Sequence, residues 1–349
     1  MKKVLLGMSG GVDSSVSAIL LKEQGYDVIG ITLELFGGTC CNTDAIVGAK
    51  QICNSIGIPH ITYNLKEEFQ CKVINNFIDE YSNQRTPNPC IECNKYMKFG
   101  AMYEKAKELG CDYIATGHYA KMEYSDEYGK YVLRKAQNSS KDQSYVLYNM
   151  PKQLLGKVLF PLGNFESKED VRKVAKEHNL SVASKPDSED ICFIPDGNYK
   201  KFLEQNSSIV PKEGNIVNRK GEVLGRHTGL YNYTIGQRKG LGISYKVPLF
   251  VIGFNKERNE VIVGEQQELY RKEMKVNEVN LLLMDKIERT LDVTVKIRYA
   301  SKPAEAIINQ TEAGNIQVIF KEPQRGITPG QSAVFYIGDV VVGGGKIQD

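Results

Sequence analysis

The first 116 residues alternate short apolar runs with segments of helical periodicity, and this alternation constrains the fold more than any other feature. Strands that alternate with helices form a parallel sheet with helices on both faces. The sequence therefore predicts an N-terminal α/β domain. Predicted strands span 3–8, 27–35, 59–64 and 111–116, and predicted helices span 14–24, 44–56, 66–81 and 95–109. The helix over 66–81 carries one apolar stripe, formed by Phe69, Val73, Phe77 and Tyr81.

The pattern changes in the second half of the chain. A hairpin is predicted over 119–135, and Ser167 with Asp170 three residues later has the spacing of a helix N-terminal capping box. Beyond about residue 209 strand pairs replace the helical period, as in 249–254 and 260–264. A half-buried strand is predicted over 293–299, where Val293, Val295, Ile297 and Tyr299 alternate with Thr294, Lys296 and Arg298. A chain of 349 residues exceeds the usual size of one core. We predict an α/β domain over 1–206 and two small β domains over 207–275 and 276–349.

Composition sets the broad class. The net charge of +3 is too mild to indicate nucleic-acid binding by itself, although it permits a local basic face. The apolar run after Met1 is too short for a signal peptide, and no run reaches membrane-spanning length, so we expect a cytoplasmic protein. Eight cysteines in such a chain are expected to be reduced thiols. Four are candidate core residues: Cys53, Cys71, Cys111 and one of Cys40 and Cys41.

A glycine- and serine-rich segment, residues 7–14, connects the first predicted strand to the first predicted helix. Ligands of open parallel sheets bind at such junctions, where the helix N-terminus favours anions. Glycines let backbone N–H groups approach phosphate oxygens, and Ser9 and Ser14 add hydroxyl donors. Asp13 is a direct or indirect Mg²⁺ partner, because hard cations prefer carboxylate oxygens.

This segment is neither a Walker A loop nor a dinucleotide-binding fingerprint, since it lacks the lysine of the first and the third glycine of the second. The alternative is a glycine-rich turn without a ligand. Residues 9–14, SGGVDS, resemble the SGGxDS loop of the PP-loop ATP pyrophosphatases. That superfamily cleaves ATP between the α and β phosphates and transfers AMP to a carbonyl or carboxylate oxygen. The loop alone does not select among its many substrates.

A proline-stiffened segment, TPNPCIECN over 86–94, holds Cys90 and Cys93. We predict Asn94 as a helix N-cap, which places Cys93 beside a helix N-terminus that favours its thiolate. The alternative is half of a structural zinc site, but a second C-x-x-C motif is missing from the sequence.

The segment DSEDICFI over 187–194 holds another candidate thiol, Cys192. The carboxylates of Asp187, Glu189 and Asp190 would raise the pKa of this thiol unless they are paired or turned away. A persulfide is more acidic than a thiol, so the objection weakens if Cys192 carries a sulfane sulfur.

These segments together resemble the MnmA family, the tRNA-uridine 2-sulfurtransferases. The resemblance lies in SGGVDS, in TPNPC-x-x-CN-x-x-x-KF, in ATGHYA over 115–120, in KDQSY over 141–145 and in DS-x-x-ICFI. It extends to TIGQRKGL over 234–241 and TPGQSAVFY over 328–336, and so spans nearly the whole chain. It implies a PP-loop domain followed by two small β domains, the last a β-barrel that clamps tRNA.

The resemblance also implies residue roles, although the tRNA group can equally be read as ordinary structural or surface residues. It implies ATP-binding residues Gly7, Met8, Ser9, Gly10, Gly11, Val12, Asp13, Ser14, Leu33 and Gly117. It implies target-base contacts at Asn88, Pro89 and Cys90, and tRNA contacts at His118, Lys141, Asp142, Gln143, Arg298, Tyr299 and Gln331.

The activity implied is ATP-dependent 2-thiolation of the wobble uridine of tRNA for lysine, glutamate and glutamine, with ATP and Mg²⁺ as cofactors. Adenylation converts the poor leaving group at C2 into AMP. Cys192 would carry a persulfide supplied by a relay protein of a cysteine desulfurase system, and Cys93 would be the nucleophile that forms a disulfide with it. That disulfide needs the two Cα atoms within about 7 Å.

One position departs from the family, in which the residue at Cys90 is often aspartate. Cys90, Cys93 and Cys192 could instead hold an iron–sulfur cluster with one open iron. Two further alternatives are another PP-loop ligase, which would need an ammonia source, and an RNA-binding protein with a vestigial nucleotide site. The intact SGGVDS loop argues against the last.

Overall fold

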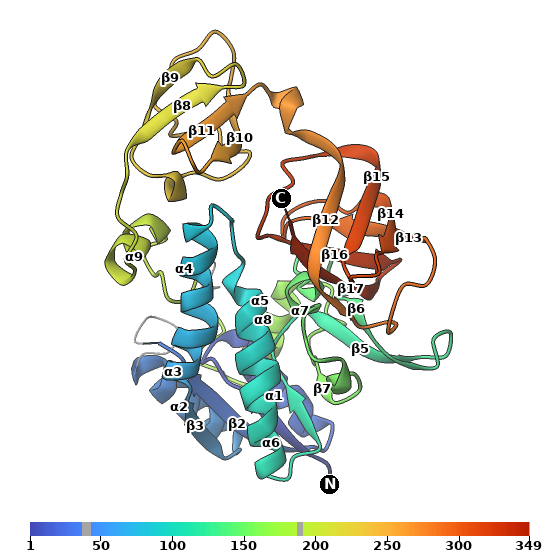
Figure 1. Cartoon of the computed structure of the whole chain (residues 1–349). Helices are drawn as coiled ribbons and strands as arrows, with labels where there is room; N and C mark the ends of the chain where they lie inside the picture. Colours follow the sequence, from blue (N-terminus) through green and yellow to red (C-terminus); the bar gives the residue numbers. More distant parts are fainter. Residues whose placement is uncertain (37–42, 187–190, 349) are drawn as a thin grey trace.

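The computed structural model describes residues 1–36, 43–186 and 191–348. These residues form three parts, which are an α/β domain, a small four-stranded β domain and a β-barrel (Figure 1). The fold class predicted from the sequence is confirmed, including the parallel sheet and the closed barrel. The predicted division at residue 275 lies inside the first strand of the barrel, β12 (Tyr270–Leu281).

The α/β domain is built on a five-stranded parallel sheet with the order β3-β2-β1-β4-β7. Its strands are β1 (Lys3–Gly7), β2 (Asp27–Glu34), β3 (His60–Asn64), β4 (Tyr113–Ala115) and β7 (Val158–Leu159). Successive side chains of a strand point to opposite faces, and here both faces are buried. Val4 and Leu6 of β1 pack into one core cluster and Leu5 into another. The central strand β1 is therefore apolar throughout.

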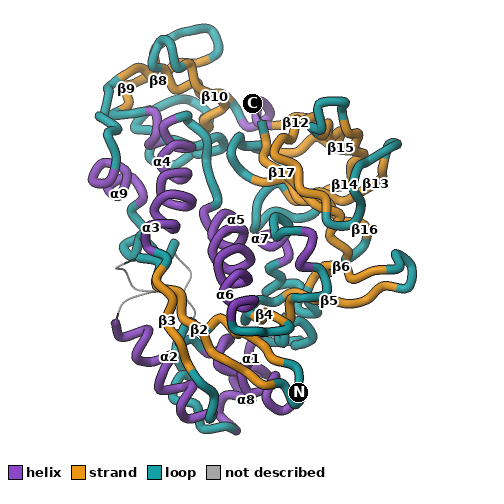
Figure 2. Tube along the Cα trace, turned by 60° about the horizontal axis from the view of Figure 1, so that its bottom comes forward, coloured by secondary structure: helices purple, strands orange, loops and turns teal. Residues whose placement is uncertain are grey.

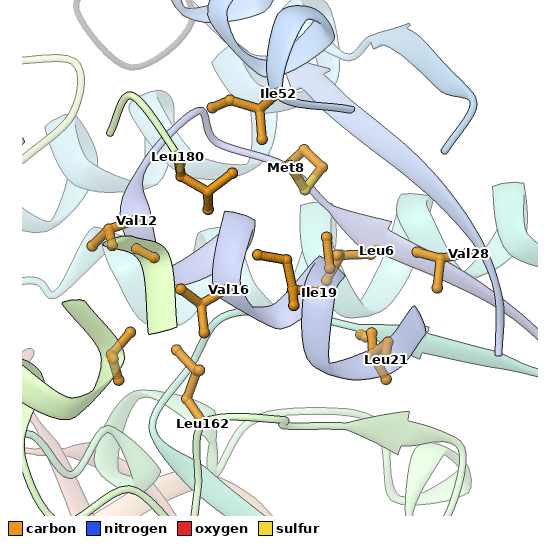
Figure 3. Packing of buried hydrophobic residues seen from close by; sticks show 14 of the residues in the cluster. Leu6, Met8, Val12, Val16, Ile19, Leu21, Val28, Ile52, Leu162 and Leu180 are labelled. Carbon is orange, nitrogen blue, oxygen red and sulfur yellow. The ribbon is translucent and has the colours of Figure 1, made fainter. Parts of the chain in front are cut away.

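Helices cover the two faces of the sheet, as Figure 2 shows. On one face lie α1 (Val12–Glu23), α2 (Thr43–Ile56) and α8 (Lys168–Glu177). Figure 3 shows Val16 and Ile19 of α1 packed against Leu6 and Leu162 there. On the other face lies α6 (Met102–Glu108), whose Met102 and Ala106 are buried. Ser167 caps α8 by accepting a hydrogen bond from the Asp170 amide, which confirms the predicted cap.

A long helical stretch follows β3 and turns its apolar stripe inward. It consists of α3 (Lys66–Phe69), a π-helical turn over Gln70–Ile74 and α4 (Asn75–Ser82). The predicted stripe is confirmed, since Phe69, Val73, Phe77 and Tyr81 are all buried. Phe202 and Leu203 of α9 (Tyr199–Asn206) pack against it, so the end of the α/β domain closes over this stripe.

The predicted hairpin is present as β5 (Ala120–Ser125) and β6 (Lys130–Lys135), paired antiparallel. β6 also pairs with the last strand of the barrel through Arg134 and Val340, so the hairpin links the two domains. The short α7 (Ser144–Leu147) follows it. The sequence predicts the hairpin but gives no indication of its partner.

The small β domain has the strand order β10-β11-β8-β9. It contains β8 (Gly214–Asn218), β9 (Val223–His227), β10 (Phe250–Asn255) and β11 (Glu260–Gly264). The predicted hairpin of β10 and β11 is confirmed. β8 and β11 are parallel neighbours, which places the two ends of this domain side by side.

The C-terminal domain is an antiparallel barrel closed by pairing of β12 with β17. After β12 it contains β13 (Leu291–Lys296), β14 (Ala304–Gln310), β15 (Ile316–Arg325), β16 (Ser332–Ile337) and β17 (Val340–Ile347). Val293 and Val295 are buried and Thr294 and Lys296 are half-buried, which confirms the predicted alternation along β13. Tyr299 is exposed because it lies beyond the end of that strand.

Among the described residues, no helix combines the length and the apolar character that crossing a membrane requires.

Candidate functional site

The predicted phosphate loop lies at the carboxyl end of β1, the central strand, and leads directly into α1. It folds on itself, because the Ser9 amide donates to Ser14 Oγ at 3.3 Å and Ser14 Oγ donates to the Gly11 carbonyl at 3.1 Å. Gly11 is the N-cap of α1 and provides no side-chain acceptor for the first-turn amides. Uncapped amides at a helix N-terminus form an anion-binding site.

Gly117 fixes the position of this loop relative to β4. A Cβ at Gly117 would lie 3.0 Å from the carbonyl carbon of Asp13 and 3.0 Å from the amide nitrogen of Ser14. Backbone atoms of a helical turn cannot move aside as a flexible side chain can. The second residue after β4 must therefore be glycine for α1 to approach this closely.

Two side chains hold the carboxylate of Asp13. Lys168 Nζ lies 2.7 Å from each oxygen, and the Tyr119 hydroxyl donates to Oδ1 at 2.7 Å. Lys168 begins α8, whose N-cap is Ser167, and its side chain is only 9% exposed. The sequence indicated Asp13 but missed both partners. Tyr119 lies within the ATGHYA motif, so a signal for it was present.

The cysteine segment has a different helix start from the one we predicted. Asn88, and not Asn94, is the N-cap, because Asn88 Oδ1 accepts from the Cys90 amide at 3.1 Å. α5 (Pro89–Cys93) then continues through a π-helical segment (Asn94–Ala101) into α6. Asn94 is buried inside the helix and donates to the Val146 carbonyl at 2.9 Å. Cys90 occupies the first turn, and Cys93 lies one turn further in.

Both β domains hold the segment that precedes α5. The Thr86 amide donates to the Pro329 carbonyl at 2.9 Å, and Gln331 Nε2 donates to the Thr86 carbonyl at 2.7 Å. The hydroxyls of Thr86 and Thr234 are 3.2 Å apart. Between Pro329 and Gln331, Gly330 has φ +87°, and a Cβ there would lie 2.8 Å from the Thr86 nitrogen. We call Thr86, Thr234, Pro329, Gly330 and Gln331 the three-domain clamp.

Cys93 and Cys192 pack against the same apolar cluster although they are far apart in sequence. This cluster includes Phe77 and Phe193, whose ring centroids are 5.4 Å apart. Phe193 thus anchors the segment next to Cys192 onto the predicted apolar stripe. Leu33, predicted at the nucleotide, packs against this cluster and against the cluster beneath the sheet. Asp187, Glu189 and Asp190 lie outside the described residues.

Cys53 is fully buried, and burial raises the pKa of its thiol to about 11, so it is a core residue as predicted. Cys71 is exposed, which makes the core prediction wrong for that residue. Cys111 is half-buried, and Cys40 and Cys41 lie outside the described residues.

The same chain matches known families along its whole length. The model described as tRNA methyl transferase HUP domain matches residues 2–196. The tRNA methyl transferase PRC-barrel domain matches residues 200–265, and the aminomethyltransferase beta-barrel domain matches residues 271–347.

Full-length relatives give a more specific assignment. A tRNA-specific 2-thiouridylase MnmA from Acetivibrio thermocellus is 49% identical, with 99% of each chain covered. One from Clostridioides difficile is 48% identical, over 99% of this chain and 98% of the relative. The chain belongs to the tRNA-specific 2-thiouridylase MnmA family. The family resemblance inferred from the motifs is thus confirmed, whereas residue roles stay predictions.

Several residues predicted to contact tRNA in this MnmA family member bind other parts of the protein. Asp142 is buried, and its carboxylate accepts from the Ala136 amide at 3.0 Å and from Ser144 Oγ at 2.8 Å. Gln143 Oε1 accepts from the Tyr119 amide at 3.0 Å. Lys141 is half-buried beside them. Asp142 and Gln143 therefore shape the loop next to the Asp13 site.

Arg298 and Gln331 also bind within the protein. Arg298 Nη2 donates to the Ile235 carbonyl at 3.1 Å and to the Gly326 carbonyl at 2.8 Å, so it joins the small β domain to the barrel. Burial lowers the pKa of this guanidinium. Gln331 belongs to the three-domain clamp. A tRNA contact of either residue stays a prediction.

Cys90 and Tyr299 are both exposed to solvent. Burial raises the pKa of the Tyr299 phenol, and the negative charges of Asp142 and of ionised Cys90 raise it further. Cys90 therefore lies near Tyr299, while Cys93 faces the apolar cluster. Across residues 1–36, 43–186 and 191–348, no three His, Cys, Asp or Glu side chains are grouped to hold a metal ion. All three candidate cysteines are in those ranges, so they do not fit an iron–sulfur cluster as placed here.

Proposed function

We propose that this protein exchanges the C2 oxygen of the wobble uridine of tRNA for sulfur, using ATP to activate the oxygen. The observation that carries the proposal is that Cys93 and Cys192, far apart in sequence, pack on one apolar cluster of the domain that also holds the phosphate loop. The relatives named tRNA-specific 2-thiouridylase support it.

The phosphate loop supports the activation step. The uridine C2 oxygen attacks the α-phosphorus of ATP, the bond to the β-phosphate oxygen breaks, and pyrophosphate leaves with the electron pair. The base loses its N3 proton and becomes an O-adenylated intermediate. The uncapped amides of α1 and the hydroxyls of Ser9 and Ser14 are positioned to bind the phosphates. Leu33, near the carboxyl end of β2, and Gly117, which packs against the backbone of Asp13 and Ser14, would line the adenosine half of ATP.

Mg²⁺ would be shared between the triphosphate and a protein carboxylate, which is its usual mode of binding in nucleotide sites. Asp13 is the carboxylate of the loop, and its side chain is about one third exposed (32%). Lys168 and Tyr119 would orient that carboxylate. Mg²⁺ would supply charge neutralisation on the phosphates.

The two cysteines support the sulfur step. The terminal sulfur of a Cys192 persulfide attacks C2, and the C2–O bond breaks as AMP leaves with the electron pair. The Cys93 thiolate then attacks the sulfur of Cys192, and the S–S bond breaks with its electron pair moving to the sulfur on C2. The products are 2-thiouridine and a Cys93–Cys192 disulfide, which an external thiol must reduce before the next turnover. Asn88, Pro89 and exposed Cys90 would contact the flipped base.

The persulfide sulfur would come from a relay protein of a cysteine desulfurase system, and the reaction would take place in the cytoplasm, where such thiols remain reduced. The route through an iron–sulfur cluster is disfavoured because, among the described residues, no three His, Cys, Asp or Glu side chains are grouped to hold a metal ion. Methyl transfer, which the family-model descriptions name, would need neither an ATP-cleaving loop nor paired cysteines.

Incubation with ATP, Mg²⁺, a sulfur donor and unmodified tRNA tests the proposal. We expect AMP, pyrophosphate and 2-thiouridine in equal amounts, identified by mass spectrometry of the digested tRNA. A methylated nucleoside, or ATP cleavage without thionucleoside in the wild-type protein, would refute it. Cys90→Asp, which restores the residue common in the family, should remain active if no cluster is involved.

A further inference from the structure

Three side chains form a hydrogen-bonded row at the carboxyl end of β4. Lys98 Nζ lies 3.3 Å from His118 Nε2, and His118 Nδ1 lies 2.7 Å from Thr116 Oγ1. The imidazole packs near the rings of Phe99 and Phe160, with centroids 6.3 Å away in each case. These two aromatic residues therefore restrict the orientation of the imidazole.

The protonation of the row follows from its partners. A lysine ammonium can only donate, so His118 Nε2 must accept and the ring proton must lie on Nδ1, facing Thr116. Burial lowers the pKa of His118 well below its ordinary value of 6.5, and the charge of Lys98 lowers it further. His118 is therefore neutral at physiological pH, while Lys98 carries the positive charge.

Lys168 and Lys98 differ in how their positive charge is balanced. The charge of Lys168 is neutralised by the carboxylate of Asp13 at 2.7 Å. Lys98 faces a neutral ring nitrogen, which fixes the direction of its ammonium group without cancelling its charge. Such a cation is suited to an anion that is present only during the reaction.

The position of Lys98 also connects the two halves of the site. Gly117, which contacts the backbone of Asp13 and Ser14, directly follows Thr116 and precedes His118. Lys98 itself lies five residues after Cys93, in the π-helical segment Asn94–Ala101. In a π-helix the hydrogen bonds join residues five apart, so such residues lie close to one face, whereas an α-helix would separate them. π-turns of this kind are frequent at functional sites.

We propose that Lys98 is a further catalytic residue, which contacts the phosphate that joins AMP to the uridine oxygen, and that His118 positions its ammonium group. This inference rests on the proposed function. As the persulfide sulfur bonds to C2 and the C2–O bond breaks, the electron pair moves to the AMP oxygen. The Lys98 ammonium stabilises the negative charge that develops there, and it does not transfer its proton.

The first test replaces the cation with an uncharged side chain of similar length. Lys98→Met should lower kcat for thionucleoside formation by about 100-fold, as loss of one charge-stabilising donor does elsewhere, with KM for ATP and for tRNA nearly unchanged. Lys105→Met is the matched control, because Lys105 lies further along the same helix and pairs with Glu108 at 2.8 Å. The control should retain wild-type kcat.

The second test separates positioning from packing. His118→Phe keeps a ring but removes the acceptor, so kcat should fall as for Lys98→Met. His118→Gln supplies an amide oxygen as acceptor and should recover much of that loss. The double variant Lys98→Met with His118→Phe should lose no more than Lys98→Met alone, since residues that act as a unit are not additive.

Two results would overturn the proposal. One is a wild-type kcat for Lys98→Met in a protein whose circular dichroism and melting match the wild type. The other is a loss confined to KM for tRNA, which would make Lys98 a contact to the tRNA backbone. Failure of the proposed function looks different, because the wild-type protein itself would then form no thionucleoside.

Discussion

The phosphate loop and the cysteine segment are held in place in different ways. The loop closes on itself through the Ser9, Gly11 and Ser14 hydrogen bonds at the start of α1, and its contacts from Tyr119, Lys168 and Lys185 come from the same α/β domain. The segment before Cys90 is held by residues more than a hundred positions away, in both β domains. We therefore expect activation of the oxygen to depend on the α/β domain, whereas delivery of sulfur depends on the assembly of three domains.

This difference implies that the two half-reactions can be impaired separately. We expect the hydrogen bonds of the phosphate loop to persist when barrel residues are substituted, because no barrel residue takes part in them. The cysteine segment, in contrast, depends on contacts with the small β domain and the barrel. The β domains therefore serve the chemistry as well as any binding of tRNA.

The largest effect is expected from removal of the nucleophile. Cys93→Ser should reduce 2-thiouridine below detection, because an alcohol cannot form the disulfide that releases the sulfur. Pyrophosphate release in a single turnover should persist, since the loop is intact. Cys71→Ser, at an exposed cysteine, is the control and should be fully active. Equal loss of pyrophosphate release would show that the half-reactions cannot be separated.

A substitution at Gly117 should affect ATP use directly and should reduce sulfur transfer less than Cys93→Ser does. Gly117→Ala places a methyl group 3.0 Å from backbone atoms of Asp13 and Ser14. Overpacking of this kind costs about 1–3 kcal/mol of folding free energy. We expect a lower melting temperature and a raised KM for ATP. Gly253→Ala is the control, because a Cβ there meets nothing within 4 Å and the backbone is not in the left-handed region, so KM for ATP and the melting temperature should not change.

A change in the three-domain clamp should impair sulfur transfer and leave ATP use intact, which is the reverse of the effect expected for Gly117→Ala. Gln331→Ala leaves the Thr86 carbonyl without its donor from the barrel, at a cost of about 1 kcal/mol. Sulfur transfer should fall several-fold while pyrophosphate release is retained. Gln324→Ala is the control, because the side-chain amide of this half-buried glutamine of the same barrel donates to the Glu322 carbonyl only two residues away. A loss of ATP binding in Gln331→Ala would contradict the independence of the loop.

The smallest effect concerns acid stability. The pKa of His118 is lowered by burial and by Lys98, and that of His60 by burial and by Lys50. In the unfolded chain both would bind protons near pH 6.5, so the unfolded state takes up more protons than the folded one below that pH. Folding stability should be fully present above about pH 6.5 and fall as the pH drops below it. Urea unfolding of His118→Gln between pH 7 and pH 5 should show a shallower decline than the wild type.

Local patterns predicted local structure well. The parallel strands, the stripe from Phe69 to Tyr81 and the cap at Ser167 are all confirmed, because each depends on periodicity or on a side chain within three residues. The helix start at Asn94 was wrong. Asn88 followed by Pro89 is the stronger start, since proline favours the first helical position. The Asn88-Pro89 pair was visible in the sequence, but the helical periodicity of residues 95–109 favoured a start at Asn94.

Contacts between distant segments were beyond the reach of such patterns. Arg298 and Gln331 read as surface residues from their polarity alone, yet both join domains. No sequence pattern singled out Lys168, because its pairing with Asp13 depends on how α8 packs against α1. Long polar side chains can bind either solvent or a distant backbone, and composition does not distinguish the two.

The sequence by itself determined the α/β domain, the phosphate loop and the family, because glycines, serines and thiols at fixed spacing act over a few residues. Only the tertiary structure decided that Cys93 and Cys192 share one cluster, that Cys90 lies near Tyr299, and that His118 forms a hydrogen bond with Lys98. These relations depend on the packing of elements across three domains. A sequence pattern does not specify the distances between such elements, because these distances are set by burial and strand register when the chain folds.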